Sequence, residues 1–167
     1  MTTAVLNEVE RILGDVYPVP SEASLDGEFS PAPDLDRLIP DLRTRHPGLA
    51  AWNCRLTLLW RDRGGKTKGR PTLGRCTKPT GLLRHFADTD IVIWLAADHL
   101  RERGATRREV EAVLFHELSH VSEDEEGAVF LVGHEAEVFF SELEHYGKEV
   151  RHLRAFVRAV QQLRLPE

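Results

Sequence analysis

Residues 112–120 read AVLFHELSH, and the last five of these positions form an H-E-x-x-H pentapeptide. An apolar run comes directly before the first histidine, so the stretch predicts a helix that is buried along one face. On a helix, positions i and i+4 lie one above the other, which lets His116 and His120 reach a single Zn²⁺ ion. Glu117 is then placed to take a proton from a water molecule at that metal. The pattern therefore predicts metal-activated hydrolysis of an amide bond.

A catalytic zinc site needs a third protein ligand and an open position for water. We expect this ligand to be His134, which opens the next predicted helix, because a connection of 13 residues lets the chain turn back after His120. Glu137, one helical turn further on, is an alternative ligand, and it would instead orient an imidazole if His134 binds the metal. His145 is a second alternative, although it would lie about 16 Å further along the same helix.

Strand and helix patterns surround the pentapeptide. The segments 55–60 and 90–95 are rich in residues that favour strands, and the continuous apolar run of the second is typical of burial on both faces. A return strand is predicted near residues 73–77. Thr106 and Glu109 form a capping box, in which each side chain satisfies a backbone donor at the start of the pentapeptide helix. The sequence therefore predicts an α+β fold.

The remainder of the chain suggests a division into two parts. Helical patterns recur in three further segments, residues 3–14, 34–45 and 150–163. Residues 18–33 are rich in proline and polar residues and predict an irregular arm. Pro40 is expected to shorten or kink the helix in which it lies. We therefore expect an N-terminal helix and arm over residues 1–33 and a metallopeptidase domain over residues 34–167.

Composition and charge narrow the possible partners. The chain has an ordinary hydrophobic content of 41%, and no stretch approaches the roughly 20 apolar residues that span a bilayer. Its N-terminal residues do not resemble a signal peptide, so we expect a cytoplasmic protein without a membrane partner. Cys54 and Cys76 form neither a metal motif nor a redox motif, and we expect both to be reduced.

One segment is strongly basic although the net charge is −5. Residues 61–84, from Arg61 to Arg84, contain eight Lys/Arg and one acid. Such a segment could contact the phosphates of a nucleic acid. It lacks the interleaved aromatic residues on which single-stranded bases stack, so a solvated hairpin tip is the preferred interpretation. Nucleic acid is therefore a less favoured partner.

The residues that follow the pentapeptide carry a family resemblance. Residues 133–139 read GHEAEVF, and Tyr146-Gly147 comes shortly after. With the pentapeptide helix they resemble the putative phage metallopeptidase family, which pairs an L-x-H-E-L-x-H helix with a later G-H-D-x-E-E-F helix. The resemblance spans roughly residues 50–147, with Glu135 in place of the family's Asp and Val138 in place of an acid.

The chain is more distantly similar to the SprT-like minimal zincins, and both resemblances imply His134 as the third ligand. We therefore expect a minimal zincin-like α+β fold, in which a small, mostly antiparallel sheet packs on the active-site helix and on a second, ligand-bearing helix. The expected function is a zinc-dependent metallopeptidase that hydrolyses protein or peptide substrates through a metal-bound water activated by Glu117. The alternative is a zinc-stabilised binding module without hydrolytic activity, whose metal is closed by a fourth ligand such as Glu137 and which could contact nucleic acid.

Overall fold

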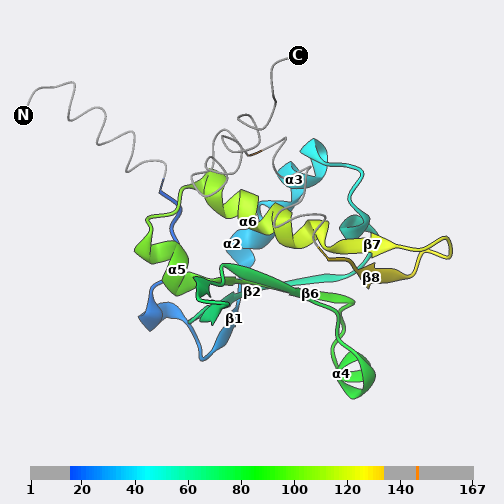
Figure 1. Ribbon diagram of the computed structural model, residues 1–167, viewed down its shortest axis with the longest axis horizontal. Helices are drawn as coiled ribbons and strands as arrows, with labels where there is room; N and C mark the ends of the chain where they lie inside the picture. The colour runs from blue at the N-terminus through cyan, green and yellow to red at the C-terminus, as the bar shows by residue number, and fades with distance from the viewer. Residues whose placement is uncertain (1–15, 134–145, 147–167) are drawn as a thin grey trace, which may run out of the picture.

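The computed structural model describes residues 16–133 and Tyr146. Within this part, the main sheet has the strand order β1-β2-β6-β5 (Figure 1). Its strands are β1 (Phe29–Pro31), β2 (Leu56–Arg61), β5 (Gly74–Thr77) and β6 (Ile91–Ala96). β2 and β6 run parallel, whereas β1 and β5 are antiparallel to their neighbours. The fold is α+β with a small mixed sheet, compatible with the expected minimal zincin-like fold.

The central position of β6 follows from its composition. Ile91, Ile93 and Leu95 are completely buried on one face, and Trp94 is nearly so on the other. A strand with two apolar faces is stable only between neighbours, and β6 lies between β2 and β5. The return strand predicted near residues 73–77 is β5, and it pairs with β6 rather than with β2. β5 is therefore an edge strand of the sheet.

The helix that carries the pentapeptide is α6 (Arg107–Ser119), which lies across one face of the sheet (Figure 1). Its predicted capping box is confirmed. The Glu109 N–H donates to Thr106 Oγ1 over 3.2 Å, and the Thr106 N–H donates to Glu109 Oε2 over 3.0 Å. Val110 and Leu114, which lie four residues apart, are completely buried. The helix is thus fixed by its start signal and by its apolar face.

The helix predicted over residues 34–45 is divided into two. The pieces are α2 (Pro33–Asp36) and α3 (Ile39–Arg45). Pro40 lies in the first turn of α3, where its missing N–H leaves no intrahelical hydrogen bond unmade. The expected interruption at this proline is confirmed. Leu35 and Leu42 still point inward from the two pieces and are completely buried.

Several short elements were not predicted from the sequence. They are α4 (Gly81–Phe86), α5 (Ala97–Glu102) and the 3₁₀ turns η1 (Glu22–Ser24) and η2 (Ala50–Asn53). α4 stands away from the sheet (Figure 1), and its Leu82, Leu83 and Phe86 are each about three-quarters exposed. α4 spans only six residues, which is too short for a helical period to be recognised in the sequence, and this explains why it was missed.

Only the middle of the basic segment over residues 61–84 forms a hairpin, because the segment also contains β5 and the first turn of α4. The strands of this hairpin are β3 (Lys66–Thr67) and β4 (Arg70–Pro71). Two basic residues of the segment are paired with acids, because Arg61 lies 2.8 Å from Glu28 and Arg63 lies 3.3 Å from Glu22. Binding of nucleic acid by this segment stays a prediction.

The N-terminal arm is partly ordered in the sheet. Residues 18–33 were expected to be irregular, but they include η1 and the edge strand β1, which pairs with β2. The division of the chain at residue 33 stays a prediction. The helices expected over residues 3–14 and 150–163 lie outside the described residues, as does the one expected to begin at His134. Among the described helices, none has the length and apolar character required to span a membrane.

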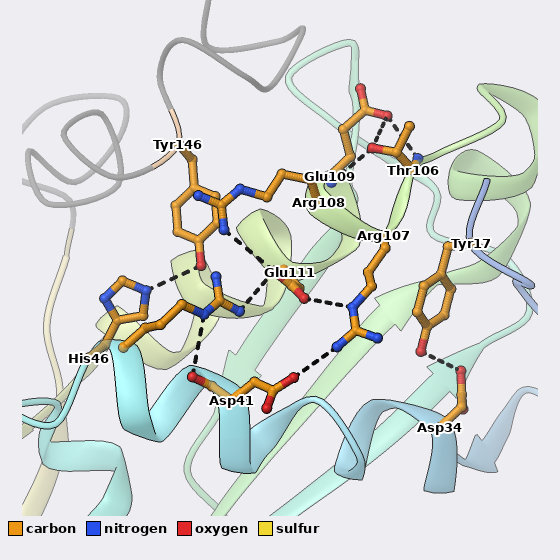
Figure 2. Close-up of polar contacts among 11 residues, drawn as sticks. Tyr17, Asp34, Asp41, His46, Thr106, Arg107, Arg108, Glu109, Glu111 and Tyr146 are labelled. Atoms are coloured by element: carbon orange, nitrogen blue, oxygen red, sulfur yellow. Dashed lines mark hydrogen bonds and ion pairs between the residues drawn. The ribbon is translucent and has the colours of Figure 1, made fainter. Parts of the chain in front are cut away.

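A cluster of charged residues joins α3 to the start of α6 (Figure 2). Glu111 accepts hydrogen bonds from Arg45 Nη2 and Arg107 Nε, each at 2.9 Å, and Arg108 lies 3.5 Å away. The Glu111 side chain is only 6% exposed. Burial by itself raises the pKa of Glu111, but the hydrogen bonds from the two arginines outweigh it, and the pKa lies below its ordinary value of 4.5. The folded state therefore favours the charged carboxylate.

We expect the substitution Glu111→Gln to lower the free energy of unfolding at pH 7 by about 2 kcal/mol, because it leaves three neighbouring arginines without their shared counter-charge. A lowered pKa in the folded state stabilises the protein fully above the ordinary pKa. The difference between wild type and variant should therefore shrink as the pH falls below about 4.5. Urea unfolding at several pH values measures this difference in the free energy of unfolding. Glu125→Gln, at an exposed acid, is the control, and an equal loss there would contradict the role of Glu111.

Candidate metal centre

The C-terminal end of α6 brings the two histidines of the pentapeptide together. The ring centroids of His116 and His120 are 5.2 Å apart, with an angle of 79° between the ring planes. Both side chains are half-buried at the edge of the core. Glu117 lies between them in sequence and is only 6% exposed. The helix thus presents two imidazoles and one buried carboxylate within a single turn.

The separation of the two rings fits a shared zinc ion. Zinc–nitrogen bonds of about 2.1 Å place each ring centroid about 3.2 Å from the metal. A tetrahedral angle of about 109° at the metal then separates the two centroids by about 5.2 Å. The observed spacing of 5.2 Å matches this value. His116 and His120 are therefore suited to hold one metal ion.

A backbone contact orients the His120 ring. Nδ1 of His120 lies 2.7 Å from the carbonyl oxygen of Val132, and the Val132 N–H donates to the carbonyl oxygen of His120 over 2.8 Å. A carbonyl oxygen only accepts, so the proton of a neutral His120 ring is on Nδ1 and the lone pair is on Nε2. Metal-binding histidines commonly have this arrangement, in which the second ring nitrogen donates to a carbonyl.

A hairpin directly after α6 returns the chain to His120. Its strands are β7 (Val121–Glu123) and β8 (Val129–Leu131). The carboxylate of Asp124 closes the turn by accepting from the N–H groups of Glu126 and Ala128, and Gly127 adopts a positive φ of 80°. The Nζ of Lys78 donates to the carbonyl oxygen of Val129 and so ties the hairpin to the segment after β5. The acidic run 123–126 is therefore part of the turn that positions Val132.

Glu117 lies over the edge strand of the sheet. α6 packs on β5 and β6. Burial, the charge of Glu117 and the nearby Cys54 raise the pKa of the Cys76 thiol on β5 to about 12. Burial also raises the pKa of Cys54, and both cysteines are free thiols. Both thiols are therefore protonated at neutral pH, and the Glu117 carboxylate lies close to β5.

Comparison with known families identifies the chain. The sequence model of the family described as "Putative phage metallopeptidase" matches residues 27–161, most of the chain. The protein belongs to this family. No curated protein and no solved structure matches it significantly. The matched region begins just before β1 and includes the whole main sheet and α6, which confirms the family resemblance and extends it beyond residues 50–147.

Membership of the putative phage metallopeptidase family implies a metal ion and a peptide substrate. The predicted third ligand His134 and its alternatives Glu137 and His145 lie outside the described residues. Among the residues that are described, no group of three or more His, Cys, Asp and Glu side chains is arranged to hold a metal. The third ligand therefore stays a prediction.

Tyr146, which is part of the family resemblance, is a packing residue. It is completely buried, its ring centroid lies 5.3 Å from that of Phe115, and the Arg108 guanidinium lies 4.3 Å from the centroid of its ring (Figure 2). Its hydroxyl oxygen is 3.3 Å from Nε2 of His46. Phe115 and Glu117 are about 200° apart around the helix axis, so Tyr146 and the catalytic candidate contact different faces of α6.

Two contacts at the candidate site were not predicted from the sequence. Val132 acts through its carbonyl oxygen, which every residue has, so no side-chain pattern indicated it. Lys78 belongs to the basic segment, where its contact with Val129 could not be distinguished from a solvated charge. Both contributions depend on how the hairpin folds back, and this folding is set by the turn at Asp124 rather than by the pentapeptide.

Proposed function

We propose that the protein is a zinc-dependent metallopeptidase in which His116, His120 and His134 bind the metal and Glu117 is the general base. The observation that carries this proposal is the pair of imidazoles 5.2 Å apart, with Nδ1 of His120 held against the carbonyl oxygen of Val132. A buried carboxylate directly beside such a pair is the arrangement that metal-assisted hydrolysis requires. Family membership supports the same reaction class.

Chain connectivity supports His134 as the third ligand. Val132 is hydrogen-bonded to His120 through both its N–H and its carbonyl group. His134 follows only two residues later, so its Cα lies within about 7.6 Å of the Val132 Cα. Glu137 and His145 follow Val132 by 5 and 13 residues, and the same contact constrains their positions far less. We therefore prefer His134 over both alternatives.

The proposed reaction divides the work between the metal and Glu117. Zinc, when bound, polarises the scissile carbonyl and lowers the pKa of water at the site to about 7. Glu117 takes a proton from that water as the water oxygen forms a bond to the carbonyl carbon. The same carboxylic acid then gives its proton to the amide nitrogen as the carbon–nitrogen bond breaks. The products are a carboxylic acid and an amine.

The edge strand β5 is the proposed binding surface for the peptide. It ends the strand order of the main sheet, and among the described strands none pairs with its outer side, where an added strand would bind. Arg75 and Thr77 on β5 are exposed. Because Glu117 lies over this same strand, a peptide paired with β5 would place its backbone carbonyls near the carboxylate. We propose that substrates are bound mainly through their main chain.

Removal and return of the metal test the proposed function. We expect the purified protein to contain one zinc ion per chain, measured by elemental analysis, and to cleave unfolded casein. A chelator such as 1,10-phenanthroline should abolish cleavage, and added Zn²⁺ should restore it. If the protein binds zinc through four protein ligands and cleaves no unfolded protein, the zinc-stabilised binding module is the correct function.

A further inference from the structure

Gly74 on β5 is a glycine that its backbone does not require. Its φ lies outside the left-handed region, so an L-residue with a side chain could adopt the same conformation. Glycine inside a strand lowers stability and often marks a place where another group approaches closely. The reason for a glycine at this position must therefore lie in what packs against it.

Two side chains, those of Glu117 and Leu95, pack against Gly74. A Cβ atom at position 74 would lie 3.0 Å from Glu117 Oε1 and 3.1 Å from Glu117 Cγ. It would also lie 2.9 Å from Cδ2 of Leu95, which is directly opposite in the β5–β6 register and completely buried. The side chains of Leu95 and Glu117 therefore together occupy the volume that a side chain at position 74 would fill.

We propose that Gly74 is a positioning residue for Glu117, because its lack of a side chain sets how closely the carboxylate approaches the edge strand. This inference rests on the proposed function, in which the peptide pairs with β5. A methyl group at position 74 must push the carboxylate away from the strand by several tenths of an ångström. Displacements approaching 1 Å from a productive geometry can lower rates by about 100-fold.

The substitution Gly74→Ala is therefore expected to lower kcat by about 10- to 100-fold. KM should change little, because alanine keeps the N–H and carbonyl groups with which β5 pairs to the peptide. Zinc content should stay the same, since His116 and His120 are not displaced. A drop in thermal stability with an unchanged kcat per folded molecule would mean that Gly74 has only a structural role, and would overturn the inference.

A double-mutant cycle with Glu117→Ala tests the contact directly. Alanine lacks both the Cγ atom and the carboxylate that lie beside position 74. Glu117→Ala alone will lower kcat, but in that background Gly74→Ala should lower kcat at least about tenfold less than it does beside Glu117. If Gly74→Ala lowers kcat by the same factor in both backgrounds, the two residues do not interact, and the inference is wrong.

The matched control is Gly48→Ala. Gly48 is an exposed turn residue, its φ lies outside the left-handed region, and a Cβ atom there would meet nothing within 4 Å. We expect this variant to keep both its activity and its thermal stability. A loss of activity equal to that of Gly74→Ala would show that the effect is not specific to the contact with Glu117.

Unfolding free energies of the same four proteins separate this inference from the proposed function. The steric conflict should destabilise Gly74→Ala, and Glu117→Ala should relieve the part of it that comes from Glu117, whether or not the protein is a peptidase. If the wild type cleaves nothing, the proposed function fails. The inference about Gly74 is then decided by whether the effects of the two substitutions on the free energy of unfolding are non-additive. If Gly74→Ala does not fold, recovery of folding in the double variant is the expected result, and its absence contradicts the inference.

Discussion

Replacement of Glu117 by glutamine is expected to lower kcat by about 10²- to 10⁴-fold while the protein keeps its zinc. Glutamine has nearly the same shape as glutamate, so it fits against β5, but its amide cannot accept the proton of the attacking water. The substitution removes a buried negative charge without opening a cavity, so thermal stability should be unchanged or slightly higher. Cleavage of unfolded casein measures the loss of activity, and elemental analysis of the same sample measures whether zinc is retained.

Glu125→Gln is the control for this experiment, because Glu125 is an exposed acid in the loop of the β7–β8 hairpin. It removes the same charge from the chain and should leave kcat unchanged. Hydrolysis retained in Glu117→Gln at the wild-type rate would refute the role of Glu117 as general base. Loss of zinc from that variant would instead indicate that Glu117 helps to hold the metal.

The second large effect concerns the third ligand. We expect His134→Ala to lose both its zinc and its activity, because two imidazoles alone hold a zinc ion weakly. Glu137→Ala should keep zinc with an affinity reduced by about 10- to 100-fold, as expected for a residue that orients a ligand. His145→Ala should behave like the wild type. Zinc content after dialysis against a competing chelator ranks the three variants.

The control is His85→Ala, since His85 lies on the exposed helix α4. Two outcomes would change the assignment. If Glu137→Ala loses zinc and His134→Ala retains it, the site is of the His-His-Glu type. If neither substitution weakens zinc binding, the proposed convergence of two successive helices is wrong, and the third ligand lies elsewhere in the chain.

The elements that follow from local signals could be predicted from the sequence. The capping box at Thr106 set the start of α6, the continuous apolar run predicted β6, and Pro40 predicted the interruption between α2 and α3. Each of these signals acts over a few residues and depends on side-chain chemistry. The pentapeptide could likewise be placed on a helix, because positions i and i+4 are neighbours on the surface of a helix.

The parts that could not be predicted depend on contacts between distant segments. The position of β6 between β2 and β5 is decided by which strand must be buried on both sides, and this requires the whole sheet. Gly74 is one of 12 glycines, and only its contact with Glu117 distinguishes it from those that serve turns. The Val132 carbonyl has no signal in the sequence at all.

The two hydrogen bonds between His120 and Val132 have a thermodynamic consequence. If His120 binds the metal as proposed, these bonds couple the closure of the β7–β8 hairpin to the affinity of His120 for the ion. Such coupling is reciprocal, so a polypeptide that binds against the hairpin and stabilises it would also raise the affinity for the metal. Occupancy by substrate and retention of the metal would then rise together.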